Sequence, residues 1–257
     1  MLQIRRLTRS FDGFRAVDEA ELDVDQGTIT GVIGPNGAGK TTLFNLIAGA
    51  LAPSSGQILF RGEPIQGLGA DRIFAKGLVR TFQIPRPFAR MTVLENAMVG
   101  GTAQSGETFW RNWWSAKRVA AEERALRARA IERLSFCGLG GKLTELAGNL
   151  SGGQQKLLEL ARALMNDPAL VLLDEPAAGV NPTLMDVLAD KILELNRRGV
   201  TFLVIEHNMD LVTRLCRPVH VMAQGRVIFS GAPEDARRDC RVVDAYLGDT
   251  SAQDLPA

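Results

Sequence analysis

The fold of this chain is decided by the stretch Gly34-Pro35-Asn36-Gly37-Ala38-Gly39-Lys40-Thr41-Thr42, which lies between a β-branched run at 28–33 and a helix-like run at 43–50. The order strand, G-x-x-x-x-G-K-T, helix is the context that a phosphate-binding loop requires. The glycines let the backbone curl so that successive N–H groups point inward, and the following helix adds the positive end of its dipole. The loop therefore predicts a nucleoside triphosphate ligand, with Lys40 on the β- and γ-phosphates and the Thr41 hydroxyl on Mg²⁺.

Composition and length bound the class of protein. The chain has 257 residues, enough for one large α/β domain or for a domain with an inserted subdomain. Its hydrophobic content of 46%, charged content of 23% and net charge of +1 are ordinary globular values and favour no nucleic-acid partner. No apolar run approaches the roughly 20 residues that span a bilayer, and no secretory signal is present, so we expect a cytoplasmic chain. Its three cysteines lack metal spacing and predict no disulfide or ligand cluster.

Ahead of the phosphate loop, the sequence predicts an antiparallel β lobe. Strands are expected at 2–7, 21–25 and 28–33, with a turn at 11–14. Phe11 or Phe14, at the end of this lobe, could stack on an adenine, because a base has an accessible π-face. Either residue could instead be a hydrophobic side chain that closes the lobe, and both interpretations stay open.

Beyond the loop, the composition changes from strand to helix. A strand at 78–82 ends at Gln83, and two prolines stiffen the loop that follows. Helices are then expected through Met98, begun by a Thr92–Glu95 capping box, and over 120–134. Between them, the aromatic and basic cluster Trp110–Trp114 is interpreted either as packing of a helical subdomain or as a contact with a membrane interface or a partner.

The second half carries the candidate catalytic groups. An apolar strand at 169–173 ends in Asp174 and Glu175, and carboxylates at the carboxyl end of a buried parallel strand face the crevice where ligands bind. Asp174 can hold Mg²⁺ through water, which leaves Glu175 to polarise an attacking water. His207 follows the strand at 200–205 and is a candidate for γ-phosphate contact. Ser151 is well placed to cap a helix over 155–165.

Together these segments resemble the ATP-binding subunits of ABC transporters over essentially the whole chain. Five motifs occur in that family's order: Walker A at 34–42, the loop glutamine Gln83, the signature Leu150-Ser151-Gly152-Gly153-Gln154, Walker B at 170–174 with Glu175, and the switch His207. One departure is Asn181, where most relatives have Asp. The resemblance implies an α/β P-loop NTPase fold, with a RecA-like core and an antiparallel β lobe (1–88 and 151–247), an inserted helical subdomain (89–150) and a mobile tail (248–257).

The resemblance also implies the reaction and its residues. Two subunits, alike or different, would enclose two ATP molecules, and residues Ser151, Gly152, Gly153 and Gln154 of one would cap the nucleotide of the other. Glu175, His207 and Lys40 would be catalytic, and Thr41, Gln83 and Asp174 would hold Mg²⁺. ATP would contact Phe11, Val17, Gly34, Pro35, Asn36, Gly37, Ala38, Gly39, Lys40, Thr41 and Thr42. Asn181 would lie at the contact between the two subunits.

Three sequence segments resemble those of the ATPases of branched-chain amino acid importers. The long interval between 83 and 151 resembles that of the longer of the two ATPases in such an importer. The three segments are Glu175-Pro176-Ala177-Ala178-Gly179, Arg80-Thr81-Phe82-Gln83, and the ending Ala245-Tyr246-Leu247-Gly248. The chain would then be peripheral on the inner face of the membrane, with two permeases as partners and a substrate-binding protein as an indirect one. ATPases of urea or amide importers and of lipopolysaccharide exporters share such traits, and a soluble ABC ATPase remains a further alternative.

Overall fold

The computed structural model describes residues 1–81, 86–101 and 116–250, and the chain divides into two compact units. The first unit holds 1–80, 169–178 and the chain from 192 onward, and the second holds 81–168 and 179–191. The expected boundaries had placed 151–168 with the core, whereas in the structure this segment belongs to the second unit, because its helix packs on the other helices there. Gln83, the Trp110–Trp114 cluster and the last residues of the expected tail lie outside the described residues.

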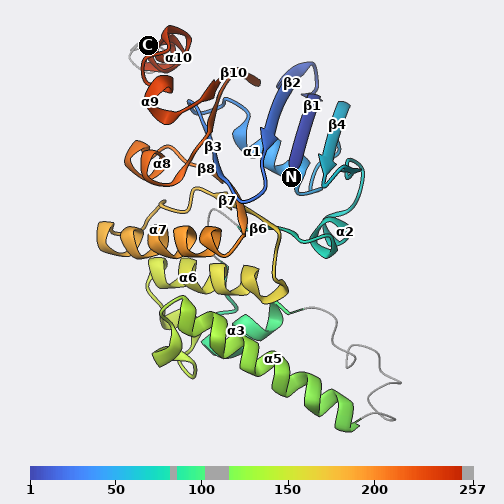
Figure 1. The fold of residues 1–257 in the computed structure, drawn as a ribbon, viewed down its shortest axis with the longest axis vertical. Helices are drawn as coiled ribbons and strands as arrows, with labels where there is room; N and C mark the ends of the chain where they lie inside the picture. The colour runs from blue at the N-terminus through green and yellow to red at the C-terminus, as the bar shows by residue number, and fades with distance from the viewer. Residues whose placement is uncertain (82–85, 102–115, 251–257) are drawn as a thin grey trace. The chain divides into compact units, whose positions relative to one another are not determined.

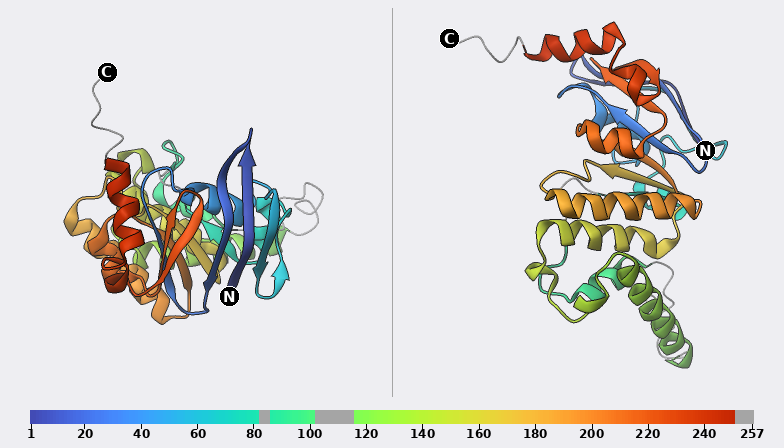
Figure 2. Two further views of the ribbon diagram at one scale, coloured as in Figure 1. Left: turned by 90° about the horizontal axis from the view of Figure 1, so that it is seen from above. Right: turned by 60° about the vertical axis from the view of Figure 1, so that its left-hand side comes forward.

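The first unit contains the antiparallel sheet that the sequence predicts. Its strand order is β2-β1-β4-β5, and the blue strands β1 and β2 can be followed side by side in Figure 2. Along β2, Ala20, Leu22 and Val24 are buried and alternate with exposed acidic residues, the period of two that defines a half-buried strand. The strands are β1 (Leu2–Phe11), β2 (Phe14–Val24), β4 (Ser55–Phe60) and β5 (Glu63–Pro64).

A second sheet of six strands, in the order β10-β9-β3-β8-β7-β6, forms the centre of the same unit. Its strands are β3 (Ile29–Ile33), β6 (Leu78–Arg80), β7 (Leu170–Asp174), β8 (Thr201–Ile205), β9 (Val219–Ala223) and β10 (Arg226–Gly231). All pairings are parallel except the β9–β10 hairpin. Every residue of β3, β7 and β8 is buried, as expected for parallel strands covered on both faces. Because β3, β8, β7 and β6 are consecutive neighbours, their carboxyl ends meet along one edge.

Among the described residues, the helices that lie wholly in the first unit are α1 (Lys40–Ile47), α2 (Ala70–Ala75), α8 (Met209–Leu215), α9 (Pro233–Ala236) and α10 (Cys240–Thr250). The hydrophobic core joins both sheets to α1, through residues such as Leu2, Phe44 and Leu172. The short helix α2 was not expected from the sequence, and it buries Ile73 in this core. Helix α10 continues through Thr250, so it includes the start of the segment expected to be a mobile tail.

Helices make up most of the second unit, where α3, α5 and α6 lie together (Figure 1). They are α3 (Val93–Val99), α5 (Ala116–Phe136) and α6 (Gly152–Ala163), and the boundary between the units falls inside α7 (Pro182–Arg197). The expected Thr92–Glu95 capping box is confirmed at the start of α3. Ala130 and Leu134, within the helix expected over 120–134, are fully buried. Across the described residues, no helix combines the length and the apolar character needed to cross a membrane.

Candidate nucleotide site

The phosphate loop joins the end of β3 to the start of α1, as the sequence predicts. Two of its glycines are required by close backbone contacts. A Cβ on Gly34 would lie 2.0 Å from the Met222 carbonyl oxygen, and one on Gly39, whose φ is +97°, would lie 2.2 Å from the Ala16 carbonyl oxygen. No other residue type fits either position without moving the backbone, because both obstacles are main-chain atoms and φ is positive.

Lys40 begins α1, and its side chain turns back over the loop. The residue is 8% exposed, and its Nζ donates to the carbonyl oxygens of Gly34 and Pro35, each at 2.7 Å. The opposite side of the loop is open, since a Cβ on Gly37 would meet nothing within 4 Å. The ammonium therefore lies against the concave backbone that is predicted to receive the phosphates.

A cavity of about 350 Å³ lies beside this loop. It is lined by Phe14, Arg15, Pro35, Asn36, Gly37, Ala38, Ala223, Gln224, Asp244 and Ala245. Phe14 is 68% exposed and Phe11 39%, and the Arg9 guanidinium lies over the Phe11 ring at 4.5 Å from its centroid. Val17 is fully buried in the core. The structure thus brings Phe14 to the cavity, while the choice of the adenine partner remains a prediction.

The two adjacent carboxylates at the end of β7 have different surroundings. Asp174 is 4% exposed, and its Oδ2 accepts a hydrogen bond from Arg80 Nη2 at 2.8 Å. Glu175 has a left-handed backbone with φ of +48°, which is uncommon for a residue other than glycine and often marks a functional site. Its N–H donates to the Ile205 carbonyl oxygen at 3.0 Å, which anchors this turn to β8.

His207, the candidate after β8, lies next to Glu175. Its Nδ1 is 3.5 Å from Glu175 Oε1, and the side chains are 57% and 18% exposed respectively. Neighbouring strands in the sheet bring these two residues together although 31 positions of sequence lie between them. The predicted water-orienting carboxylate and the predicted phosphate contact therefore share one edge of the sheet.

Sequence reasoning assigned no role to Glu206, which the structure places between these groups. The residue is 1% exposed. Its Oε1 accepts from the Ala177 N–H at 2.8 Å, and its Oε2 accepts from the His207 and Asn208 N–H groups at 2.9 and 3.0 Å. One buried carboxylate thus joins the turn after β7 to the turn after β8. The signal was an acidic residue directly after an apolar strand, but its burial could not be read from the sequence.

The described residues fit a magnesium ion. Thr41 supplies a hydroxyl and Asp174 a carboxylate, both hard oxygen ligands of the kind that Mg²⁺ prefers. Within the described part of the chain, no group of three or more His, Cys, Asp or Glu residues could hold a metal by itself. Mg²⁺ commonly uses one or two protein oxygens and completes its shell with water and substrate phosphates, so this sparse donor set suits it.

The signature residues lie in the second unit, at the start of α6. Ser151 Oγ accepts from the Gln154 N–H, and Gln154 Oε1 accepts from the Ser151 N–H at 3.1 Å, which completes a capping box. Ser151 and Gly152 are exposed. Gly153 is buried, and a Cβ there would lie 2.0 Å from Leu184 Cδ2. The motif therefore presents its first residues to solvent, while Gly153 is needed for packing within the unit.

Asn181, the position that departs from the family pattern, caps helix α7. Its Oδ1 accepts a hydrogen bond from the Leu184 N–H at 2.9 Å. Asn and Asp are both favoured at helix N-termini because a short side-chain oxygen reaches these unpaired N–H groups. The substitution therefore keeps the local structural role of the residue.

The comparison with known protein families decides the class of this chain. A family model described as ABC transporter matches residues 17–178. The chain belongs to the ABC transporter family. The match includes the phosphate loop, the signature and both carboxylates at the end of β7, so the motifs predicted from the sequence lie in the family's own region.

Curated ABC proteins resemble the chain over nearly its whole length. It is 41% identical to a probable branched-chain amino acid transport ATP-binding protein, LivG, of Archaeoglobus fulgidus. The alignment covers 96% of this chain and 95% of that protein. It is 39% identical to the high-affinity branched-chain amino acid transport ATP-binding protein BraF of Pseudomonas aeruginosa, with 97% and 98% covered. A crystal structure of the ADP conformation of an ATP-binding cassette of an ABC transporter has a TM-score of 0.84 and 36% identity, covering 96% of this chain and 98% of that one.

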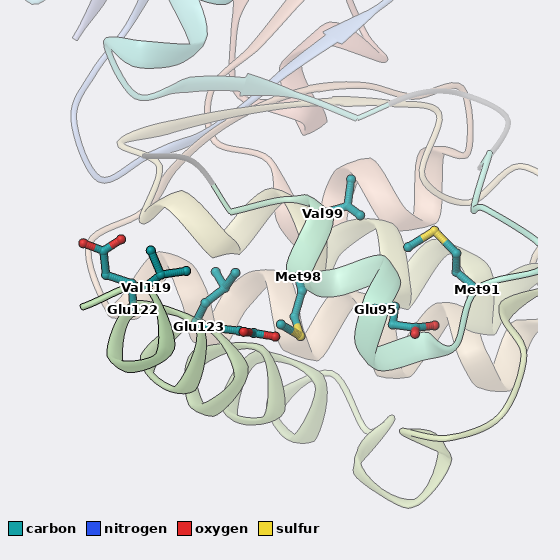
Figure 3. A pocket seen from close by; sticks show the side chains of 8 residues that line it. Met91, Glu95, Met98, Val99, Val119, Glu122 and Glu123 are labelled. Atoms are coloured by element: carbon teal, nitrogen blue, oxygen red, sulfur yellow. The ribbon is translucent and has the colours of Figure 1, made fainter. Parts of the chain in front are cut away.

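These findings confirm the predicted ABC ATPase fold and the class of ATP-hydrolysing transport subunit. Another cavity is lined by residues of the second unit. Figure 3 shows this cavity, whose volume is about 270 Å³, with labelled side chains from α3, from the start of α5 and from Met91, two residues before α3. Its lining is Met91, Glu95, Met98, Val99, Val119, Glu122, Glu123 and Leu126. Three carboxylates and no cation make this cavity unsuitable for a polyphosphate.

Proposed function

We propose that this ABC ATPase uses MgATP to drive the uptake of branched-chain or related amino acids. The observation that carries the proposal is the edge of the six-stranded sheet, where the phosphate loop, Asp174, Glu175 and His207 follow neighbouring strands. The substrate class is supported by the LivG and BraF proteins, which are similar over nearly the full length of both chains.

In the proposed mechanism, each side chain has one task. The ammonium of Lys40, now on two loop carbonyls, moves onto the β- and γ-phosphates, and the loop N–H groups stabilise the same charge. Thr41 and Asp174 would hold Mg²⁺, together with Gln83, and the bound ion would supply charge neutralisation at the phosphates. Glu175 orients the attacking water, and His207, 3.5 Å from it, stabilises charge on the transferring phosphoryl group.

The site is completed by a second ATP-binding subunit, identical or different. Exposed Ser151 and Gly152 at the start of α6 offer a hydroxyl and helix N–H groups, which suit an anion. Two permeases hold the subunit on the inner face of the membrane, and a substrate-binding protein delivers the amino acid to them. The Asn181 region lies beside the contact between the two ATPases.

Glu175→Gln tests the chemistry. Because the amide is nearly isosteric but cannot orient the water in the same way, ATP affinity should be kept while hydrolysis slows by about 100-fold or more. The variant should also accumulate as a dimer during size-exclusion chromatography with MgATP and stay monomeric without it. Glu132→Gln, on an exposed face of α5, is the matched control. Hydrolysis at the parental rate in Glu175→Gln would assign the base elsewhere.

Uptake experiments test the substrate. A strain lacking the gene should regain uptake of radiolabelled leucine, isoleucine and valine when the parental chain is supplied, and should not regain it with Glu175→Gln. Restored uptake of urea or an amide, with leucine uptake unchanged, would select the other importer class. Loss of lipopolysaccharide from the cell surface in the deletion strain would instead indicate an exporter.

A further inference from the structure

Arg80 ends β6, beside β7, and its guanidinium contacts two different elements. Nη2 donates to Asp174 Oδ2 at 2.8 Å, and Nη1 donates to Asn45 Oδ1 on α1. The arginine side chain is 16% exposed and Asp174 only 4%. The Phe44 ring lies 6.0 Å from the guanidinium carbon, which further confines the group. Arg80 therefore makes a largely buried bridge between a strand end and a helix.

Both ends of this bridge adjoin the oxygens that fit Mg²⁺. Asp174 is one of the two residues, with Thr41, whose oxygens fit Mg²⁺. At the other end, Asn45 follows Thr41 by four residues in α1, about one helical turn, so Asn45 and Thr41 share a helix face. Within the described residues, the guanidinium contacts Oδ2 of the carboxylate, and Oδ1 is assigned to the proposed metal site. The planar fork of arginine suits this geometry, because its two terminal nitrogens donate in fixed directions.

We propose that Arg80 is a positioning residue of the divalent-cation site, which fixes the orientation of the Asp174 carboxylate and the distance between β7 and the Thr41 face of α1. The inference rests on the proposed use of MgATP. Groups that hydrogen-bond a metal-ligating side chain set its orientation, and their loss typically weakens metal affinity by about 10- to 100-fold. A simple counter-charge for Asp174 would not need the second contact, to Asn45.

The test separates position from charge. The affinity of a fluorescent N-methylanthraniloyl ATP analogue is measured with MgCl₂ and with EDTA, and the ratio of the two dissociation constants gives the contribution of the metal. In Arg80→Ala, the Mg²⁺ concentration that gives half of the metal's increase in analogue affinity should rise about 10-fold or more. The affinity measured in EDTA should stay within about twofold of the parental value. Arg80→Lys keeps the positive charge but not the fork, and it should show the same defect.

Two further variants complete the design. Asn45→Ala removes the other end of the bridge and should weaken the magnesium effect in the same direction, less than additively with Arg80→Ala. Arg5→Ala is the matched control, because Arg5 pairs with Asp23 at 2.7 Å where the side chains are 40% and 53% exposed, far more than those of Arg80 and Asp174. Thermal melts of all variants show that they are folded.

Each result has one interpretation. A parental magnesium response in Arg80→Ala, or rescue by Arg80→Lys, would overturn the positioning role, and a stronger response would show that Arg80 competes with the ion. If the parental protein itself lacked any magnesium response, the proposed MgATP function would fail first, and this inference with it.

Discussion

Glu206→Gln should destabilise the nucleotide site more than any neutralisation of an exposed glutamate. In the parental chain the carboxylate, 1% exposed, accepts three backbone hydrogen bonds. The amide oxygen of Gln can take the place of Oε2 and keep the bonds from His207 and Asn208. The amide nitrogen then faces the Ala177 N–H, so a donor meets a donor in a buried position.

The magnitude follows from these bonds. A hydrogen bond to a charged group contributes about 1.5–3 kcal/mol, and the two retained bonds become neutral ones of about 0.5–1.5 kcal/mol. The lower cost of burying an amide than a carboxylate offsets part of the loss. We expect a net destabilisation of about 3 kcal/mol, which for a chain of this size lowers Tm by about 6–12 °C.

Calorimetry without nucleotide measures this shift, and steady-state ATPase assays follow its consequence. Because Glu206 holds the turns that carry both Glu175 and His207, turnover should also fall, by about 10- to 100-fold, as these groups lose their alignment. Glu63→Gln is the control, since Glu63 pairs with Lys76 on the surface and is 67% exposed. A Tm change in Glu206→Gln no larger than in this control would refute the reasoning.

Two other predictions concern backbone space and pH. Gly39→Ala should abolish ATP binding and lower Tm more than Gly37→Ala does in paired melts. Both positions have a positive φ that strains Ala, but a Cβ on Gly39 would also overlap the Ala16 carbonyl oxygen, whereas Gly37 has open space. Equal Tm losses would contradict this. Burial lowers the pKa of His220 below its ordinary value of about 6.5, so the neutral ring, held by Ser230 Oγ at 2.7 Å, is favoured in the folded state. The stability that this shift contributes is present above about pH 6.5 and should be lost as pH falls toward the folded pKa. In urea titrations, the difference in free energy of unfolding between pH 7.5 and pH 5.5 should therefore be smaller in His220→Gln than in the parental chain.

The local elements of the site were predictable because each follows a short-range rule. The phosphate loop needs glycines at fixed spacing between a strand and a helix, and Gly34 and Gly39 meet backbone oxygens as that rule requires. The capping box expected at Thr92 depends on residues three positions apart and is present, and Ser151 caps a helix as expected, although that helix begins at Gly152 and not at 155. The β-branched run at 28–33 and the apolar run at 169–173 predicted strands, and β3 and β7 are buried throughout.

Other features depended on contacts between distant parts of the chain. The helix α2 is too short for a periodic pattern and is held by Ile73 in the core. The helix that begins at the signature was expected with the RecA-like core, but its apolar face packs on α3 and α5, so it belongs to the second unit. Neither outcome is set by propensity alone, because tertiary packing decides where an amphipathic face is buried.

The sequence by itself predicted the groups of the candidate site: a phosphate loop with Lys40, and carboxylates and a histidine placed after strands. Only the tertiary structure decided how they meet, because the order β3-β8-β7-β6 sets which strand ends are neighbours. That order brings His207 to Glu175 and gives Asp174 its partner Arg80, 94 positions away in the chain. The role of Glu206 also follows only from the tertiary structure. Its hydrogen bond joins two turns that are close in space, and such a contact produces no recognisable residue spacing in the sequence.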